Sequence, residues 1–415
     1  MQDIYIMKDR KHLPKDYIKR PVYSNRIMPF VDKQIIKVIT GQRRVGKSYI
    51  MYQIVDEILG TNPKANIIFI NKELKEFDFI KTEHDLYGYI HQLLQPRVSN
   101  YVFVDEIQDI YKFEKAFRSL LAESCCDLFC TGSNANLLSG ELATLLAGRY
   151  IEIKVHSLDY DEFLNFMDLK VGNDSLVKYF ELGGMPYLRV IGANKEDAYE
   201  YLKNVYSSIL LKDVIARENI RNVYFLENLV SFLADNTGNM FSANNISKYL
   251  KAQHITVTTQ TVVNYLKPLT NANFIYKMQR YDLKGLKIFE TGAKYYFEDI
   301  GLRNSIVGFE LQKDIQKIME NAVFHHLLRH QYKLYVGKIG ESEIDFVAER
   351  RGSKIYIQVA YLLRQQSTIN REFGNLLKIS DNYPKYVVTM DEYNSGTNYR
   401  GITQMHIGDF LLKDL

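Results

Sequence analysis

The chain contains little cysteine and no apolar run long enough to cross a membrane. Its three cysteines, Cys125, Cys126 and Cys130, are clustered, with no further cysteine or histidine at the spacing of a zinc site. This pattern argues against a disulfide framework and favours buried, reduced thiols. Charges interrupt the first ten residues, where a secretory signal needs an apolar segment, and eighteen uninterrupted apolar residues occur nowhere. The sequence therefore predicts a cytoplasmic protein without a membrane partner.

Tryptophan is also absent, and the aromatic side chains comprise 31 tyrosines and 22 phenylalanines. Tyrosine interleaved with lysine can stack nucleic-acid bases, although amphipathic packing is its commoner use. A chain of 415 residues that is 46% hydrophobic and 25% charged has a globular composition and is expected to form roughly two to four domains. The net charge of +4 is too small to identify a partner by itself.

A phosphate-binding loop is the most specific motif of the chain. The segment GQRRVGKS at 41–48 fits the template G-x-x-x-x-G-K-[ST] and directly follows the apolar run 35–40. Its glycines permit a tight turn that points backbone N–H groups at phosphate oxygens. Helical spacing begins at Ser48, so the phosphates would lie at a helix N-terminus. Lys47 is expected to contact the β and γ phosphates of ATP, and Ser48 to bind Mg²⁺. The predicted nucleotide-binding residues are Gly41, Gln42, Arg43, Arg44, Val45, Gly46, Lys47, Ser48 and Tyr49.

Two adjacent carboxylates follow a second strand pattern, YVFVDEIQD at 101–109. An apolar run that ends in acids places both at the carboxyl edge of a sheet, where open α/β folds bind ligands. Asp105 is the expected partner of Ser48 on Mg²⁺. Glu106 is the expected group that orients or deprotonates the attacking water. Two acids after a strand are not specific alone, but together with the upstream loop they predict an ATP-hydrolysing site.

A third strand pattern, 127–134, ends in the small polar residues Ser133 and Asn134. The order of the phosphate loop, VDEIQ, TGSN, LAGRY, HSLDYDEF and GGMP resembles that of archaeal and bacterial AAA+-type ATPases. In those proteins the core precedes a winged helix and a PD-(D/E)XK-like C-terminal region. The resemblance covers nearly the whole chain.

The resemblance implies roles for three further residues. Ser133 or Asn134 occupies the position that senses the γ-phosphate. Arg149 is implied to lie near the site or at a subunit boundary, which makes a second copy of the chain a candidate partner. The alternative for Arg149 is a surface arginine paired with Glu152.

Positive charge is concentrated in residues 241–287. Seven basic residues against one acid give this segment a net charge of +6, more than the whole chain carries. Helix patterns at 242–251 and 256–266 precede an alternating strand pattern at 275–281, which is the order of a winged helix. Contact with DNA is one interpretation, and a winged helix used only for protein packing is the other. In the first, the second helix would offer Thr259, Gln260, Thr261 and Asn264 to base edges, and lysines would contact phosphates.

The residues after 306 show a helix pattern at 317–329 and several strand patterns. They resemble the PD-(D/E)XK nuclease core, with Glu320, Asp345 and Gln358 in its metal-side positions. Ala360 stands where that core has a catalytic lysine, which predicts an inactive module; Arg364 and Lys354 are the candidate replacements if it is active. Two histidines spaced by four, 326 and 330, have no apparent third ligand and are expected to be packed or at the surface.

The predicted fold is α/β and has four parts. They are an AAA+-type P-loop core with a parallel sheet at 1–165, a helical lid at 166–230, a winged-helix domain at 231–305, and a restriction-endonuclease-like α/β module at 306–415. The predicted function is Mg²⁺-dependent ATP hydrolysis coupled to a conformational change on DNA or a protein partner. One alternative is a nucleotide-gated regulatory protein with negligible turnover. A metal-dependent nuclease regulated by ATP is another.

Overall fold

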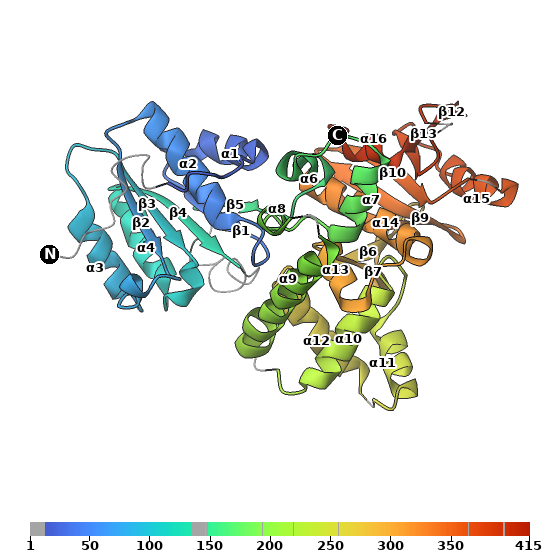
Figure 1. Cartoon of the computed structure of the whole chain (residues 1–415), viewed down its shortest axis with the longest axis horizontal. Coiled ribbons are helices and arrows are strands. Elements are labelled where there is room, and N and C mark those ends of the chain that lie inside the picture. Colours follow the sequence, from blue (N-terminus) through green and yellow to red (C-terminus); the bar gives the residue numbers. More distant parts are fainter. Residues whose placement is uncertain are drawn as a thin grey trace. The chain divides into compact units, whose positions relative to one another are not determined.

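The computed structural model shows two compact units (Figure 1). The first consists of Met1–His156 and Asn271–Asn273, and the second of Ser157–Thr270 and Phe274–Leu415. None of the helices in the described part of the chain is both long and apolar enough to cross a bilayer. The residues that the structure describes are 13–133, 146, 148–192, 194–218, 220–255, 257–363, 365–392 and 395–415.

A five-stranded parallel sheet forms the centre of the first unit, in the order β2-β3-β4-β1-β5. Both faces of the sheet are covered, which explains why the strands read as continuous apolar runs. The three strand patterns that the sequence analysis identified correspond to β1, β3 and β4. The strands are β1 (Ile36–Thr40), β2 (Asn66–Asn71), β3 (Asn100–Asp105), β4 (Asp127–Gly132) and β5 (Tyr150–Lys154).

Helices cover the two faces of this sheet in pairs (Figure 1). Helices α1 and α2 pack on the face that carries Ile39, Phe69 and Phe103. Helices α3 and α4 pack on the face that carries Val38 and Val104. The helices are α1 (Pro21–Ile27), α2 (Lys47–Thr61), α3 (Glu83–Leu93) and α4 (Phe113–Glu123), and short 3₁₀ turns are η2 (Met28–Phe30), η3 (Lys75–Phe77) and η4 (Ile107–Asp109).

The second unit begins with a run of helices. The glycine pair at 183–184 follows the second helix of this run. Gly183 has a left-handed φ of +72°, and a Cβ on Gly184 would overlap the carbonyl oxygen of Leu158, so both positions require glycine. The helices up to the central sheet are α6 (Tyr160–Met167), α7 (Asn173–Leu182), α8 (Leu188–Ile191), α9 (Lys195–Ser208), the π-helix η6 (Ile209–Ala216), α10 (Val223–Asp235), α11 (Ala243–Ala252) and α12 (Thr259–Asn271).

A mixed eight-stranded sheet follows, in the order β12-β13-β11-β10-β9-β8-β6-β7. Helix α15 packs on one face, and α14 contacts β7, β8, β9 and β10. The elements are β6 (Ile275–Asp282), β7 (Lys287–Phe297), α13 (Ile300–Val307), α14 (Leu311–Arg329), β8 (Lys333–Ile339), β9 (Ser342–Arg350), β10 (Ser353–Ala360), α15 (Gln366–Leu377), β11 (Lys385–Thr389), β12 (Asn398–Tyr399), β13 (Ile402–His406) and α16 (Ile407–Leu411).

The two predicted helices of the basic segment are present as α11 and α12. Ser242 caps α11 by accepting a hydrogen bond from Asn245 N–H, and Thr258 likewise accepts from Thr261 N–H. The predicted strand is β6, which forms an antiparallel hairpin with β7. Because β6 also pairs in parallel with β8, this hairpin is continuous with the C-terminal sheet, a connection that no local sequence pattern indicates.

Candidate functional site

The phosphate loop connects β1 to α2 with an unusual backbone. Gly41 has a φ of +146°, Arg44 of +71° and Gly46 of +94°. A side chain at Gly41 would overlap the carbonyl oxygen of Val155, so only glycine fits there. When right- and left-handed backbone conformations alternate along a loop, successive N–H groups line a concave surface that binds anions. The loop is thus shaped as the motif predicts, and α2 begins at Lys47.

Lys47 is buried, at 5% exposure, between the loop and the acidic pair. Its ammonium donates to the carbonyl oxygen of Gln42 at 3.1 Å and lies 3.8 Å from Glu106 Oε1. The side-chain amide of Gln42 is fully buried, and neither its nitrogen nor its oxygen has a hydrogen-bond partner in the described part of the chain. Such an unpaired amide is costly unless a ligand satisfies it.

Asp105, the last residue of β3, connects this strand to helix α2 and to the neighbouring strand β4 at the carboxyl edge of the sheet. Its side chain accepts hydrogen bonds from the hydroxyls of Ser48 and Thr131. Burial raises the pKa of Asp105, and these two bonds oppose that shift. Thr131 lies at the end of β4, which is between β1 and β3 in the sheet. The sequence analysis missed Thr131, because only the strand order shows that it lies beside the acidic pair and bonds to both of its members.

Glu106 is held in one orientation next to Lys47. Its backbone is left-handed, with a φ of +55°, and its N–H donates to Thr131 Oγ1 at 2.9 Å. Its carboxylate accepts a hydrogen bond from the Gln108 amide. Only 11% of the side chain is exposed. A carboxylate fixed in this way, within reach of a lysine that meets phosphates, can orient a water molecule.

The remaining predicted residues of the nucleotide site differ in burial and in their partners. Ser133 is fully buried immediately after β4, whereas Asn134 lies outside the described residues. Arg149 is exposed just before β5, and in the described part of the chain the partner of Glu152 is Thr40 Oγ1, at 2.6 Å. Tyr49 on α2 is 50% exposed, and Arg43 lies 3.8 Å from a carboxylate oxygen of Glu73.

Arg20 is a further residue of the site that the sequence analysis did not identify. Its guanidinium donates to the carbonyl oxygens of Val45 and His156, both at 2.9 Å, and is 4% exposed. It therefore ties the phosphate loop to the segment after β5. The contacts span 25 and 136 residues and involve backbone carbonyls, so no pattern of side chains in the sequence indicates them.

The second unit contains a separate cluster of charged side chains. Glu320 on α14 and Asp345 on β9 meet as expected, and Gln358 on β10 accepts from Asp345 N–H at 2.7 Å. Ala360 leaves the lysine position of β10 without a cation, but a lysine from another strand lies beside these acids. Lys294 on β7 places its ammonium 3.0 Å from Asp345 Oδ1, 3.3 Å from Glu320 Oε2 and 3.0 Å from Glu343 Oε1.

Lys294 differs from both replacements suggested by the sequence. Lys354 pairs with Glu349 at 2.8 Å, and Arg364 lies outside the described residues. The carboxylates beside Lys294 raise its pKa against the lowering effect of burial, so the ammonium remains charged. Burial raises the pKa of Glu320 to about 7. Lys294 is thus a counter-ion that partly neutralises an acidic cluster.

The paired histidines on α14 bond to the backbone. His326 Nε2 lies 3.2 Å from the carbonyl oxygen of Lys413, and His330 Nδ1 lies 2.9 Å from that of His326. Burial lowers the pKa of His326 to about 3. These packed histidines belong to none of the candidate metal-binding groups found among the described residues.

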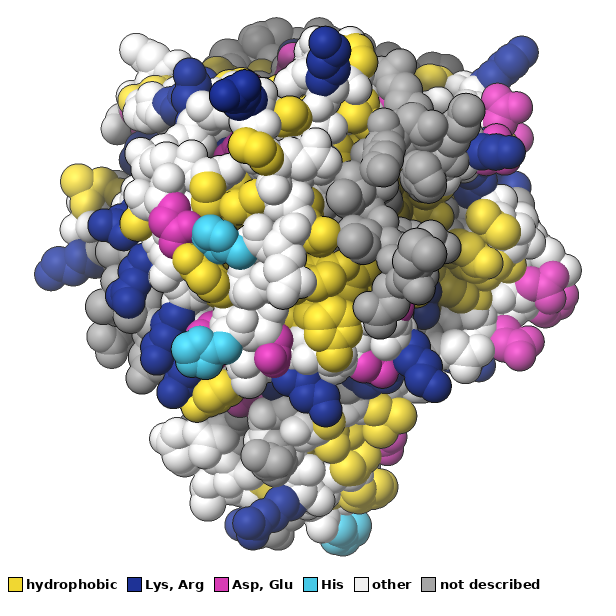
Figure 2. Space-filling view, turned by 90° about the vertical axis from the view of Figure 1, so that its left-hand side faces the viewer, with side chains coloured by type: hydrophobic (Ala, Val, Ile, Leu, Met, Phe, Trp, Pro, Cys, Tyr) yellow, Lys and Arg dark blue, Asp and Glu magenta, His cyan; other side chains and the backbone are white. Residues whose placement is uncertain are grey.

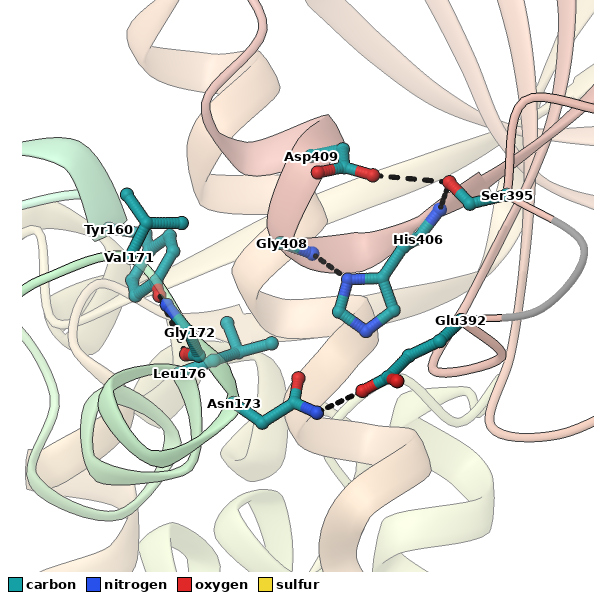
Figure 3. A pocket seen from close by; sticks show the side chains of 10 residues that line it. All are labelled: Tyr160, Val171, Gly172, Asn173, Leu176, Glu392, Ser395, His406, Gly408 and Asp409. Carbon is teal, nitrogen blue, oxygen red and sulfur yellow. Dashed lines mark hydrogen bonds between the residues drawn. The ribbon is translucent and has the colours of Figure 1, made fainter.

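A cavity of about 310 Å³ lies elsewhere in the second unit (Figure 3). Most of its polar groups bond to one another: Asn173 donates to Glu392, Ser395 to Asp409, and Gly408 N–H to His406 Nδ1. None of its lining residues belongs to the phosphate loop or to the Lys294 cluster. The cavity is therefore separate from both groups of functional side chains.

Comparisons with known proteins agree with the geometry of the first unit. A family model described as an AAA domain matches residues 33–164, and a model for a domain of unknown function (DUF8612) matches residues 173–313. Among solved structures, an Aeropyrum pernix ORC1 protein in complex with DNA has 11% identity and a TM-score of 0.35, covering 71% of this chain and 93% of its own. A likeness this weak carries no argument about function.

Two relatives in sequence are described only as uncharacterized proteins. One, from Methanocaldococcus jannaschii, is 30% identical over 345 residues, which cover 80% of this chain and 75% of the relative. The other, from Haemophilus influenzae, is 34% identical over 411 residues, which cover 97% of this chain and all of the relative. The chain therefore belongs to one family with the Haemophilus influenzae relative, and its first unit contains an AAA domain with a phosphate loop, an acidic pair and a parallel sheet.

Proposed function

We propose that the chain is a Mg²⁺-dependent ATP hydrolase that couples nucleotide turnover to a conformational change on DNA or a protein partner. The observation that carries this proposal is the convergence of Lys47, Ser48, Asp105 and Glu106 at one sheet edge. Steady-state phosphate release from ATP, with and without duplex DNA, tests it. Turnover that depends on Mg²⁺ supports a hydrolase, whereas tight ATP binding without turnover supports the alternative of a nucleotide-gated regulatory protein.

The donor set of the site fits a magnesium ion. The Ser48 hydroxyl and the Asp105 carboxylate are hard oxygen ligands that already lie within hydrogen-bond distance of each other. These two groups would hold Mg²⁺, which supplies charge neutralisation on the phosphates. The loop amides and Lys47 bind the phosphate oxygens, and the buried Gln42 amide lies beside them as an unpaired donor and acceptor.

Glu106 is the residue to which we assign activation of the attacking water. Thr131 and Gln108 hold its backbone and carboxylate, so the base is oriented before substrate binds. Ser133 or Asn134, after the same strand as Thr131, would respond to the γ-phosphate. The exposure of Arg149 leaves it accessible to a neighbouring copy of the chain, which supports a role at a subunit boundary.

For residues 231–305 we propose a winged helix that contacts DNA. Three helices precede a hairpin, and a bridge between Phe241 and Ala293 adds a strand position beside that hairpin. Thr259, Gln260 and Asn264 are exposed on α12, where they are available to base edges. Among the described residues of the face that Figure 2 shows, basic and acidic side chains are interspersed. The segment 241–287, with its net charge of +6, is the surface that we propose for DNA.

DNA binding by this segment is expected to weaken steeply as salt increases. Replacing Lys248, Lys251 and Lys267, all exposed, with glutamine should flatten the dependence of log K on log salt by up to about one unit for each lost phosphate contact. Fluorescence anisotropy with a labelled duplex at several salt concentrations measures this slope. The matched control replaces three other exposed lysines of the same unit, Lys170, Lys203 and Lys313. An unchanged slope, or no binding at low salt, supports the packing interpretation instead.

For residues 306–415 we propose a nuclease-like module without nuclease activity. Ala360 provides no cation, and the Lys294 ammonium is held among three carboxylates, which leaves it poorly placed to stabilise charge on a phosphate. Supercoiled plasmid incubated with the protein and Mg²⁺ or Mn²⁺ should therefore stay supercoiled. Asp345→Ala should make no difference. Nicking that disappears in both Asp345→Ala and Lys294→Gln, while circular dichroism shows both variants folded, would show that Lys294 has taken over the catalytic role and that the module is a nuclease.

A further inference from the structure

Three side chains with metal-binding atoms meet at the edge of the first unit where β4 begins, and a further thiol adjoins them. His91 lies in the last turn of α3, and Glu123 is the last residue of α4. Cys125 and Cys126 follow in the turn that leads to β4. Ser124, between the acid and the first thiol, has a left-handed φ of +54°. This turn reverses the chain, so that Glu123 and Cys125 come together beside the end of the neighbouring helix.

The separations of the donor atoms suit a tetrahedral cation. Cys125 Sγ lies 3.8 Å from Glu123 Oε2 and 3.9 Å from Cys126 Sγ, and His91 Nε2 lies 2.7 Å from Glu123 Oε2. The ligand atoms of His91, Glu123 and Cys125 all lie within 4.8 Å of one another. Zinc with bonds of about 2.3 Å to sulfur and about 2.0–2.1 Å to nitrogen or oxygen separates its ligand atoms by roughly 3.3–3.8 Å. Cys125 Sγ needs almost no movement, His91 and Glu123 need to separate by about half an ångström, and the Cys126 side chain has to turn toward the other three donors, judged from the same bond lengths.

Tyr87 orients two of these ligands from outside the cluster. Its hydroxyl donates to Glu123 Oε1 at 2.7 Å, which leaves Oε2 directed at His91. Its ring lies one helical turn before His91, with ring centroids 4.5 Å apart. Ligands at metal sites are commonly held by such outer hydrogen bonds, which set the direction of the donor atom. An ordinary surface ion pair between His91 and Glu123 would not require the hydrogen bond from Tyr87 or the two adjacent thiols.

We propose that His91, Glu123 and Cys125 form a binding site for a thiophilic divalent cation of the zinc class, with the Cys126 thiol completing four-coordination. A mixed set of sulfur, nitrogen and oxygen donors selects zinc over magnesium or calcium, which prefer oxygen alone. His91 is 32 residues before Glu123, which explains why the cysteine spacing gave no sign of it. The cation would join α3, α4 and β4.

The site is distinct from the nucleotide site. The cysteines precede the first residue of β4, whereas Thr131 and Ser133 are at its carboxyl end. Six strand residues at about 3.3 Å each separate the two ends. The expected role of the cation is therefore to stabilise the first unit, because a ligand that binds only the folded state raises its stability.

Cobalt(II) titration of the reduced, metal-free full-length protein, without nucleotide, tests the proposal. Co²⁺ stands in for zinc, and its bond to a thiolate gives near-ultraviolet charge-transfer absorption that oxygen ligands at Ser48 and Asp105 do not produce. The expected result is absorption that saturates at about one equivalent of cobalt and is lost on addition of Zn²⁺. Zn²⁺ is also expected to slow alkylation of Cys125 by iodoacetamide.

Variants separate this site from nonspecific cobalt binding. The double variant Cys125→Ser/Cys126→Ser should abolish the charge-transfer absorption, and Cys125→Ser, Cys126→Ser and His91→Gln should each weaken cobalt binding at least tenfold. Tyr87→Phe should weaken it by about tenfold. The matched control is His84→Gln, which removes another exposed histidine of α3 outside the cluster and should leave the titration unchanged. Absence of saturable absorption in the unaltered protein, or its survival in the double variant Cys125→Ser/Cys126→Ser, would overturn the proposal.

Discussion

Replacement of Glu106 by glutamine is expected to slow ATP hydrolysis about a hundredfold while leaving ATP bound as tightly as before. The amide keeps the size of the side chain and its contact with Gln108, but it cannot take a proton from water. The substitution also removes a negative charge 3.8 Å from the Lys47 ammonium. Loss of this charge does not weaken the attraction of the site for phosphates. Steady-state phosphate release and equilibrium binding of a fluorescent ATP analogue measure the two effects separately.

Lys47→Ala provides the contrasting result, because it should weaken nucleotide binding itself. Glu76→Gln, a neutralisation of an exposed acid in the same unit, is the matched control and should change neither quantity. Normal turnover in the Glu106→Gln protein would remove Glu106 from the mechanism. The base would then have to be sought among the other polar groups at this sheet edge.

Lys294→Met is expected to destabilise the second unit by about 3–5 kcal/mol, the usual result of removing one partner from a buried ion pair. The ammonium is 4% exposed and faces Glu320, Asp345 and Glu343. Methionine fills much of the space, so the loss is electrostatic rather than a cavity. Urea unfolding followed by circular dichroism at pH 8 measures it. Lys277→Met, on the neighbouring strand β6 and exposed, is the control and should cost little.

The dependence of this loss on pH identifies its cause. Because the pKa of Lys294 is raised in the folded protein, its contribution is fully present below the unfolded value and disappears only in strongly alkaline solution. Burial raises the pKa of Glu320 to about 7, so this carboxyl takes up a proton between pH 8 and pH 5. The effect of Lys294→Met should therefore shrink at pH 5. It should also shrink when Glu320→Gln and Asp345→Asn are added, and equal losses in all three measurements would contradict the electrostatic explanation.

The sequence by itself determined the elements that depend on neighbouring residues. The phosphate loop, the acidic pair and the capped helices α11 and α12 each lie within a short segment. Their chemistry follows from turn-forming glycines, strand patterns and capping hydroxyls, which act over a few residues. Most predicted strands and helices are present for the same reason. Even the meeting of Lys47 with Asp105 and Glu106 could be expected, because parallel strands end at a common edge.

Only the tertiary structure decided which distant side chains complete these sites. Lys294 meets its acids across 26 and 51 residues, Arg20 reaches the carbonyl oxygen of His156 across 136, and His91 meets Glu123 across 32. Each contact depends on strand order or helix packing. Strand order and helix packing produce no pattern in the sequence near these residues. A lysine on β7 can pair with acids on α14 and β9 because a charge acts through space, whatever strand carries it.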